Sequence, residues 1–317
     1  MSTAVLMFPG QSSKCPDMIE KLASTSPESA ALVARASEIL GRDLLAHYGA
    51  TNTAMFASNR DVQVGVFLAN HLHLAALTRA GVEAAWSVGL SLGEYNHLVH
   101  IGALTFEDAL PLIDARGRLY EDAASTEAES GVMVSVFPVE AGLVEHTITA
   151  LGLGGRAVIG LYNSPRQQVL SGERAAVDQV IAALEAEVFV DATVIEPRIP
   201  MHAPRFAPVG ERLGAVLADT RLTVPRLPYV PNVLGTVLEA ATVGDVRSCL
   251  VAHASQSVRW QASIEALAAR VSDPVFVEVG PRAVLYNMIG RGWTPGRRAK
   301  TDGPDLGAIA AELEYAG

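Results

Sequence analysis

The segment 89–93 reads G-L-S-L-G and has residue types and a spacing that suit covalent acyl chemistry. A serine in the pattern G-x-S-x-G is typical of a nucleophile elbow, a sharp turn between a strand and a helix. The apolar residues 84–88 predict the strand, and a helix is expected to begin directly after Ser91. The N–H groups at the start of that helix would point to the place where an oxyanion forms. Ser91 is therefore the candidate nucleophile.

A serine nucleophile needs a base, and the chain has eight histidines. His202 follows a strand-like segment and stands between prolines that would hold its imidazole in a fixed loop. His253 is a competing candidate, and the residues alone do not decide between the two. His97 and His100 are spaced to share one face of the helix after Ser91, but no third ligand has a recognisable spacing, so we expect no metal site.

The composition is that of an ordinary globular protein. The chain has 317 residues, 50% of them hydrophobic and 18% charged, which is enough to bury a large core. A net charge of -10 disfavours nucleic acid as the main partner, because phosphate binding needs a basic surface. The two cysteines, Cys15 and Cys249, cannot form a disulfide framework, so a reducing cytoplasm is the expected compartment.

No targeting or membrane segment is predicted. The apolar run at the N-terminus lacks a cationic leader and breaks at Pro9. The most apolar region is interrupted by Arg79, Glu83 and Glu94, so no stretch reaches the length of a membrane-spanning helix. We therefore expect a cytoplasmic protein without membrane contact.

Between residues 127 and 196 the pattern predicts a small α+β domain. Its elements follow the order strand, helix, strand, strand, helix, strand, which is the ferredoxin-like pattern with two helices on one face of an antiparallel sheet. The expected strands are 132–137, 157–162, 168–171 and 188–194, and the expected helices are 140–151 and 173–186.

The remaining residues, 1–126 and 197–317, predict one large α/β domain into which the small domain is inserted. Its expected strands include 4–8, 84–88 and 274–279, and its expected helices include 26–40, 62–79, 105–124 and 205–217. Helix 62–79 is apolar on nearly every face and should lie in the middle of the domain. The segment 293–304 is rich in Gly, Pro and charge, so we expect an exposed loop before a C-terminal helix.

Four separated motifs give the chain a resemblance to a known family. The segments F-P-G-Q-S-S (8–13), G-L-S-L-G-E-Y (89–95), A-R-G-R (115–118) and P-M-H (200–202) resemble, in the same order, motifs of the malonyl-CoA:acyl carrier protein transacylase family. That family includes discrete, trans-acting acyltransferases of polyketide pathways. Weaker matches lie at 163–165, 230–233, 258–260 and 278–281. The resemblance implies a large α/β-hydrolase-like domain with a ferredoxin-like insert, in agreement with the element pattern.

The resemblance also implies roles for the candidate residues. Ser91 would be the nucleophile and His202 the general base and acid. The main-chain carbonyl of His253, rather than its ring, would orient His202. The backbone N–H groups of Gln11 and Leu92 would form the oxyanion hole.

Arg116 would bind the free carboxylate of a malonyl group through a bidentate pair, for which a planar guanidinium is suited. The reaction would be ping-pong: an acyl-CoA or acyl-carrier-protein donor acylates Ser91, and the phosphopantetheine thiol of an acyl carrier protein accepts the group. No metal or redox cofactor is implied, and we expect a monomer in polyketide or fatty-acid-type biosynthesis.

Several residues near the expected acyl pocket depart from the family pattern. Leu90 replaces a usual histidine, Tyr120 stands where methionine is common, and Met201 precedes the base where serine or phenylalanine is usual. Together with Asn163, from one of the weaker matches, we assign these residues to the acyl pocket. The departures leave open transfer of a bulkier acyl or aminoacyl group between two carrier proteins. A thioester hydrolase is a further alternative, although it would not need Arg116.

An acidic enzyme that meets an acidic carrier protein needs a local basic patch. The densest basic cluster of the sequence is Arg291, Arg297, Arg298 and Lys300. We predict that these residues dock the carrier protein. The alternative is a solvated loop without a partner.

Overall fold

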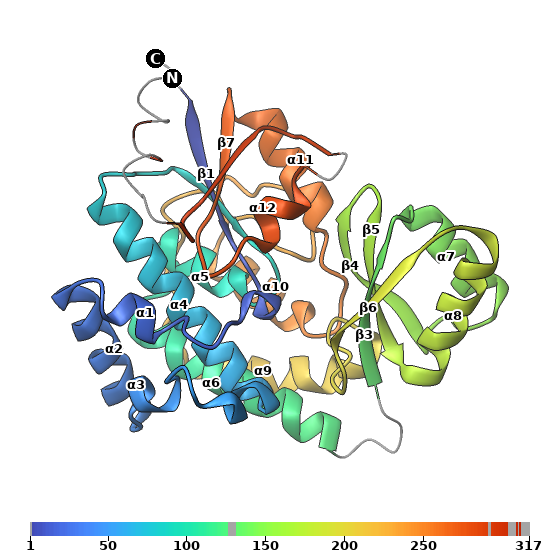
Figure 1. Cartoon of the computed structure of the whole chain (residues 1–317), viewed down its shortest axis with the longest axis horizontal. Coiled ribbons are helices and arrows are strands. Elements are labelled where there is room, and N and C mark those ends of the chain that lie inside the picture. Colours follow the sequence, from blue (N-terminus) through green and yellow to red (C-terminus); the bar gives the residue numbers. More distant parts are fainter. Residues whose placement is uncertain (1, 126–130, 291–292, 304–308, 310, 312–317) are drawn as a thin grey trace.

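A computed structural model describes residues 2–125, 131–290, 293–303, 309 and 311 (Figure 1). One of its two sheets has four strands in the order β2-β1-β7-β8. They are β1 (Thr3–Phe8), β2 (Trp86–Gly89), β7 (Pro274–Glu278) and β8 (Arg297–Lys300). All three pairings are parallel, so the carboxyl ends of these strands lie at one edge of the sheet. Ligands of open α/β sheets bind at that edge, and here it carries Ser91 and the turn after β1.

Helices surround this sheet and bury its strands (Figure 1). The central one is α4, which packs against α6 and is buried over most of its length, as the apolar pattern of residues 62–79 predicts. The helices are α1 (Glu20–Ala23), α2 (Pro27–Leu40), α3 (Leu44–His47), α4 (Asn59–Arg79), α5 (Gly93–His100), α6 (Phe106–Ser125), α9 (Ala207–Asp219), α10 (Val243–His253), α11 (Trp260–Arg270) and α12 (Val284–Met288). No helix of the described part combines the length and the apolar character needed to cross a membrane.

The second sheet is antiparallel, has the order β4-β5-β3-β6 and lies apart from the first (Figure 1). The predicted order of elements is confirmed: β3 (Gly131–Phe137), α7 (Ala141–Ala150), β4 (Ala157–Ser164), β5 (Gln167–Glu173), α8 (Arg174–Glu187) and β6 (Asp191–Glu196). Alternate residues of β3 face opposite sides. Val132 and Val134 join the core under α7 and α8, whereas Met133 joins the main core. The second face of the small sheet thus contributes to the site described below.

The prediction of an exposed loop over 293–304 is wrong for residues 297–300, which form strand β8. This strand pairs with β7, with Val275 opposite Arg297 and Glu278 opposite Lys300. An edge strand can pair through its backbone without an apolar side-chain pattern, and of these four residues only Ala299 is buried. The C-terminal helix predicted after residue 304 lies mostly outside the described residues.

Candidate active site

The elbow around Ser91 has the geometry that the motif predicts. Strand β2 ends at Gly89, α5 begins at Gly93, and Ser91 between them has a left-handed φ of 52°. A Cβ on Gly89 would lie 2.0 Å from the carbonyl carbon of Gly93, and a Cβ on Gly93 would lie 2.0 Å from the carbonyl oxygen of Phe8. Glycine is therefore required on both sides of the serine. Strain of this kind is typical of residues that the fold holds in place for function.

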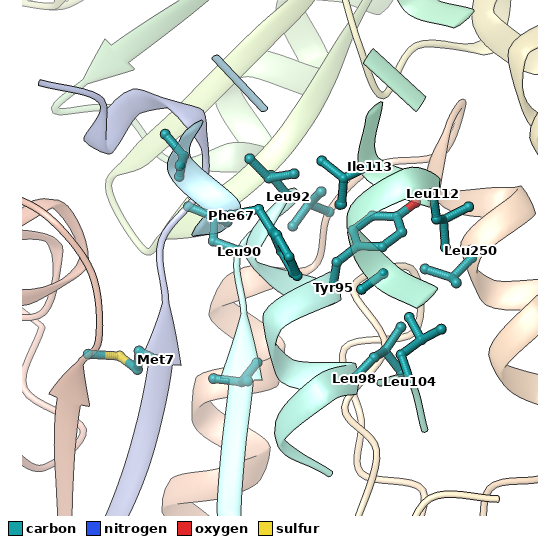
Figure 2. Packing of buried hydrophobic residues seen from close by; sticks show 14 of the residues in the cluster. Met7, Phe67, Leu90, Leu92, Tyr95, Leu98, Leu104, Leu112, Ile113 and Leu250 are labelled. Carbon is teal, nitrogen blue, oxygen red and sulfur yellow. The ribbon is translucent and has the colours of Figure 1, made fainter. Parts of the chain in front are cut away.

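The side chains that follow Ser91 in the elbow pack into the main core. Leu92 and Tyr95 pack with Ile113 and Leu112 of α6 in the main core, and Figure 2 shows this cluster from close by. Tight packing on fixed helices limits the motion of the turn that carries Ser91.

His202 lies within hydrogen-bond distance of the serine. Its Nε2 is 2.8 Å from Ser91 Oγ, and its Nδ1 is 2.9 Å from the main-chain carbonyl oxygen of His253. Because a carbonyl oxygen only accepts, Nδ1 carries the proton and the lone pair of Nε2 faces the serine hydroxyl. Burial, together with the nearby charge of Arg116, lowers the pKa of His202 to about 3, which keeps the ring neutral. The arrangement can therefore remove a proton from Ser91.

The structure separates the two candidate bases. It brings the ring of His202 to the serine, and the ring of His253 stacks behind it with centroids 4.8 Å apart. Met201, which precedes the base, accepts a 2.6 Å hydrogen bond from Ser171 through its carbonyl oxygen. This bond and the left-handed φ of 62° at His202 fix the loop that presents the ring.

Gln11 and Leu92, the predicted oxyanion-hole residues, flank the serine. Leu92 is the N-cap residue of α5. Gln11 belongs to the wall of the cavity that contains Ser91 and His202. The turn before Gln11 passes so close to the elbow that a Cβ on Gly10 would lie 2.9 Å from the carbonyl oxygen of Leu90. The main chain of this turn and the N-terminus of α5 thus meet at the nucleophile.

Apart from Gly10 and Ser12 of the turn after β1, the rest of this cavity wall is apolar. Leu90 and Met201, predicted to face the acyl group, lie in it, and the small sheet contributes three further apolar side chains: Met133, Leu161 and Ile195. Asn163 lies on β4 and is buried, but it is not part of this wall.

Arg116 on α6 is only 2% exposed, which is unusual for a charged side chain. Its Nη1 donates a 2.5 Å hydrogen bond to Gln63 Oε1, and its guanidinium carbon lies 5.4 Å from the ring centre of Tyr95 and 4.9 Å from that of Tyr120. Among the described residues Nη2 has no hydrogen-bond partner. An unpaired buried donor costs about 1–3 kcal/mol, more for a charged group, so this nitrogen is suited to an anionic ligand.

Asn232 and Glu94 also contact the elbow, and the sequence alone did not predict a role for either residue. Asn232 Oδ1 accepts a 2.8 Å hydrogen bond from the Ser91 N–H, and its Nδ2 donates a 2.7 Å bond to the Gly89 carbonyl. Glu94 is fully buried and accepts from the main-chain N–H of Asn232 at 3.3 Å. Both residues lie in motifs that carry the family resemblance, and these motifs could have indicated a role for them.

The two histidines considered as a metal pair make other contacts. Ser87 Oγ lies 2.7 Å from His97 Nδ1 and 2.8 Å from His100 Nδ1. Val230 also donates a 3.0 Å main-chain hydrogen bond to His97 Nε2. Within the described ranges no group of three or more His, Cys, Asp or Glu side chains is placed to hold a metal ion.

The structure describes three of the four predicted docking residues, and two of them make contacts within the fold. Arg297 donates to Asp273 at 2.8 Å, and Arg298 donates to main-chain carbonyl oxygens of α12 and the residue after it. Lys300 is exposed at the carboxyl end of β8, on the same sheet edge as Ser91. Arg291 lies outside the described residues.

Comparisons with known proteins agree with this geometry. The acyl transferase domain family matches residues 5–306. The malonyl CoA-acyl carrier protein transacylase of Escherichia coli K12 is 28% identical over 293 residues, which cover 92% of this chain and 93% of that protein.

Solved structures agree as well. The malonyl CoA-acyl carrier protein transacylase of Coxiella burnetii superposes with a TM-score of 0.91 at 26% identity, covering 98% of both chains. A malonyl-transacylase in complex with a type II PKS acyl-carrier protein superposes with a TM-score of 0.89 at 25% identity, covering 98% of this chain and 99% of that one. The fold is thus a mixed α/β fold shared with these transacylases, and the chain belongs to the acyl transferase domain family and is an acyltransferase.

Proposed function

We propose that this enzyme transfers a malonyl group from malonyl-CoA through Ser91 to the phosphopantetheine thiol of an acyl carrier protein. The observation that carries the proposal is the pairing of Ser91 with a neutral, carbonyl-oriented His202. The same molecule buries the Nη2 of Arg116, which has no hydrogen-bond partner among the residues that the structure describes. The names of the relatives support the same donor and acceptor. They give no support to the alternative of a bulkier acyl or aminoacyl group.

In the first half-reaction Ser91 Oγ attacks the thioester carbonyl carbon. His202 Nε2 takes the hydroxyl proton, and the negative charge moves to the former carbonyl oxygen, near the main-chain N–H groups of Gln11 and Leu92. The C–S bond then breaks, and the departing CoA sulfur receives the proton from His202. The product is malonyl-Ser91, an oxygen ester.

The second half-reaction runs the same steps in reverse with a new thiol. The carrier-protein thiol gives its proton to His202, and its sulfur attacks the ester carbonyl. Ser91 leaves and takes the proton back. One histidine thus serves as base and acid in turn, and no bound cofactor takes part in either step.

Arg116 would make the enzyme selective for an acyl group that carries a carboxylate. Gln63 holds one guanidinium nitrogen, and the rings of Tyr95 and Tyr120 hold its plane. The second terminal nitrogen remains for a carboxylate oxygen of the malonyl group.

We expect Arg116→Ala to lower kcat/KM for loading from malonyl-CoA by roughly 30- to 1000-fold, because a charge-assisted pair in a buried pocket contributes about 2–4 kcal/mol. Loading from acetyl-CoA should change much less. Parallel loading assays with the two donors measure the ratio, with Arg118→Ala as a control from the exposed side of the same helix. An equal loss for both donors would remove Arg116 from the carboxylate role.

For the architecture, we propose residues 1–126 and 197–317 as an α/β-hydrolase-like catalytic domain and residues 127–196 as a ferredoxin-like insert. The strand order β4-β5-β3-β6 and the position of α7 and α8 over one core support the second assignment. We further propose that the enzyme acts as a monomer in the cytoplasm.

For carrier-protein docking, Lys300 remains the strongest member of the basic cluster, since Arg297 and Arg298 are engaged in internal contacts. Three strand spacings separate β8 from β2, so Lys300 lies roughly 14 Å from the line of the nucleophile strand. We expect Lys300→Glu to raise the KM for carrier protein severalfold, more at low salt, without changing self-acylation. Kinetics at two ionic strengths measure this, and an unaltered KM would assign docking to another surface.

A further inference from the structure

A buried carboxylate lies behind the base, separated from it by a second imidazole. Glu94 Oε2 is 3.0 Å from His253 Nδ1, and the two side chains are 0% and 1% exposed. The His253 ring in turn stacks on the His202 ring at 4.8 Å with an interplanar angle of 26°. The Glu94–His253 contact is electrostatic, because the two atoms are close but lack the alignment of a hydrogen bond.

The position of Glu94 is fixed by two donors on its other oxygen. Tyr229 donates its hydroxyl hydrogen to Oε1 at 2.5 Å, and Asn232 donates its main-chain N–H at 3.3 Å. The side chain of Asn232 also accepts from the Ser91 N–H. The carboxylate is therefore part of the structure that holds the elbow, and it cannot turn away from His253 without breaking these bonds.

The ionisable groups around Glu94 determine whether its carboxylate is the negative charge of this region. Burial raises the pKa of Glu94 to about 7, while hydrogen bonds from Tyr229 and Asn232 and the charge of Arg116 act in the opposite direction. The other groups that face it are neutral at pH 8, because burial raises the pKa values of Tyr95, Tyr229 and Cys249. Burial also lowers the pKa values of His202 and His253.

Arg116 is therefore the cation of this region and Glu94 its anion when Glu94 is ionised. Once a substrate carboxylate neutralises Arg116, the Glu94 carboxylate remains 3.0 Å from the His253 ring, which stacks on His202. A backbone carbonyl offers only a partial charge to the imidazolium that forms when His202 takes a proton.

We propose that Glu94, acting through the His253 ring, is the buried negative charge that stabilises the protonated form of His202 during acyl transfer. Glu94 is a positioning residue whose charge acts on His202 from a distance. No proton passes from His253 to Glu94, and the main-chain carbonyl of His253 still orients His202. This inference rests on the proposed roles of Ser91 and His202, and it adds a charged carboxylate to a base otherwise oriented by a carbonyl oxygen.

The test is Glu94→Gln, which keeps the shape and can still accept from Tyr229 and Asn232. Removing the negative charge disfavours the imidazolium, so the pKa of His202 falls and the base becomes weaker. In steady-state transfer from malonyl-CoA to acyl carrier protein between pH 4 and 9, we expect kcat to fall about tenfold with KM nearly unchanged. In the wild-type enzyme kcat should rise with pH as Glu94 ionises around pH 7, and Glu94→Gln should lack this rise, so the loss should be largest above pH 7.

Glu278→Gln is the matched control. Glu278 is equally buried, its pKa is also raised to about 7 by burial, and it accepts main-chain N–H bonds from Val284 and Tyr286 at the end of β7. It has no contact with His202 or His253 in the described chain. We expect this variant to lose thermal stability without a selective loss of kcat.

His253→Phe supplies the second variant. It retains the main-chain carbonyl and a stacked ring but removes the polar contact, so its effect should not add to that of Glu94→Gln. Unchanged kcat in both variants, additive losses, or an equal loss in Glu278→Gln would overturn the inference. A Ser91→Ala variant that still loads malonyl would instead overturn the proposed function, so the two failures are distinguishable.

Discussion

Replacement of Ser91 by alanine is expected to abolish malonyl loading, with a loss of at least about 10⁴-fold. The hydroxyl oxygen is the atom that forms the ester, and it lies 2.8 Å from His202 Nε2, whose lone pair can take its proton. The fold should be retained, because the left-handed backbone at residue 91 is held by Asn232 and the flanking glycines rather than by the side chain.

Loading of purified Ser91→Ala with radiolabelled malonyl-CoA, followed by denaturing gel analysis, measures this loss. Ser24→Ala provides the control, since Ser24 is exposed and its hydroxyl donates to the main-chain carbonyl oxygen of Lys21. Covalent label on the Ser91→Ala protein at the wild-type rate would mean that another residue carries the acyl group.

Replacement of His202 by alanine should lower the rate of the loading step by a factor comparable to that of Ser91→Ala, because nucleophile and base act as a unit. The two half-reactions should differ in their pH dependence. A serine hydroxyl needs the base at every accessible pH, whereas the carrier thiol, with an ordinary pKa of about 8.5, forms its own thiolate as pH rises. Transfer from malonyl-Ser91 to carrier protein should therefore recover partly between pH 7 and 9 in His202→Ala, and loading should not.

Rapid mixing measures loading in His202→Ala; transfer is measured after prolonged incubation with malonyl-CoA has accumulated malonyl-Ser91 and the donor has been removed. Exposed His146→Ala on α7 is the control. Equal recovery of both steps at high pH would contradict the assignment of His202 as the base for Ser91. If His202→Ala lost only the transfer step, His202 would act in the second half-reaction and not in loading.

The parts of the fold that sequence reasoning predicted well depend on local pattern. The glycine spacing around Ser91 predicts a strand–turn–helix because only glycine fits the close approaches on either side of it. The alternation of strands and helices between residues 131 and 196 reflects side chains that face one compact core. Such signals lie within a few residues of each other and need no knowledge of the tertiary structure.

The parts that escaped prediction depend on contacts between distant segments. Asn232 is 141 residues from Ser91 in sequence, and Glu94 is 138 residues from its donor Asn232, so no local spacing links them. Strand β8 was missed because its pairing with β7 uses backbone groups while its side chains are mostly charged. Contacts of Arg297 with Asp273 and of Arg298 with main-chain carbonyl oxygens also join distant segments, so the charge pattern alone did not indicate them.

The most direct test of the account is mass spectrometry of the intact enzyme after brief incubation with malonyl-CoA, followed by peptide mapping and then by addition of holo-acyl carrier protein. We expect a mass increase of one malonyl group, located on the peptide that contains Ser91. We also expect loss of that mass when carrier protein is added, with the same mass appearing on the carrier's phosphopantetheine. An enzyme that remains unmodified, or that carries the malonyl group on another residue, would contradict the central claim.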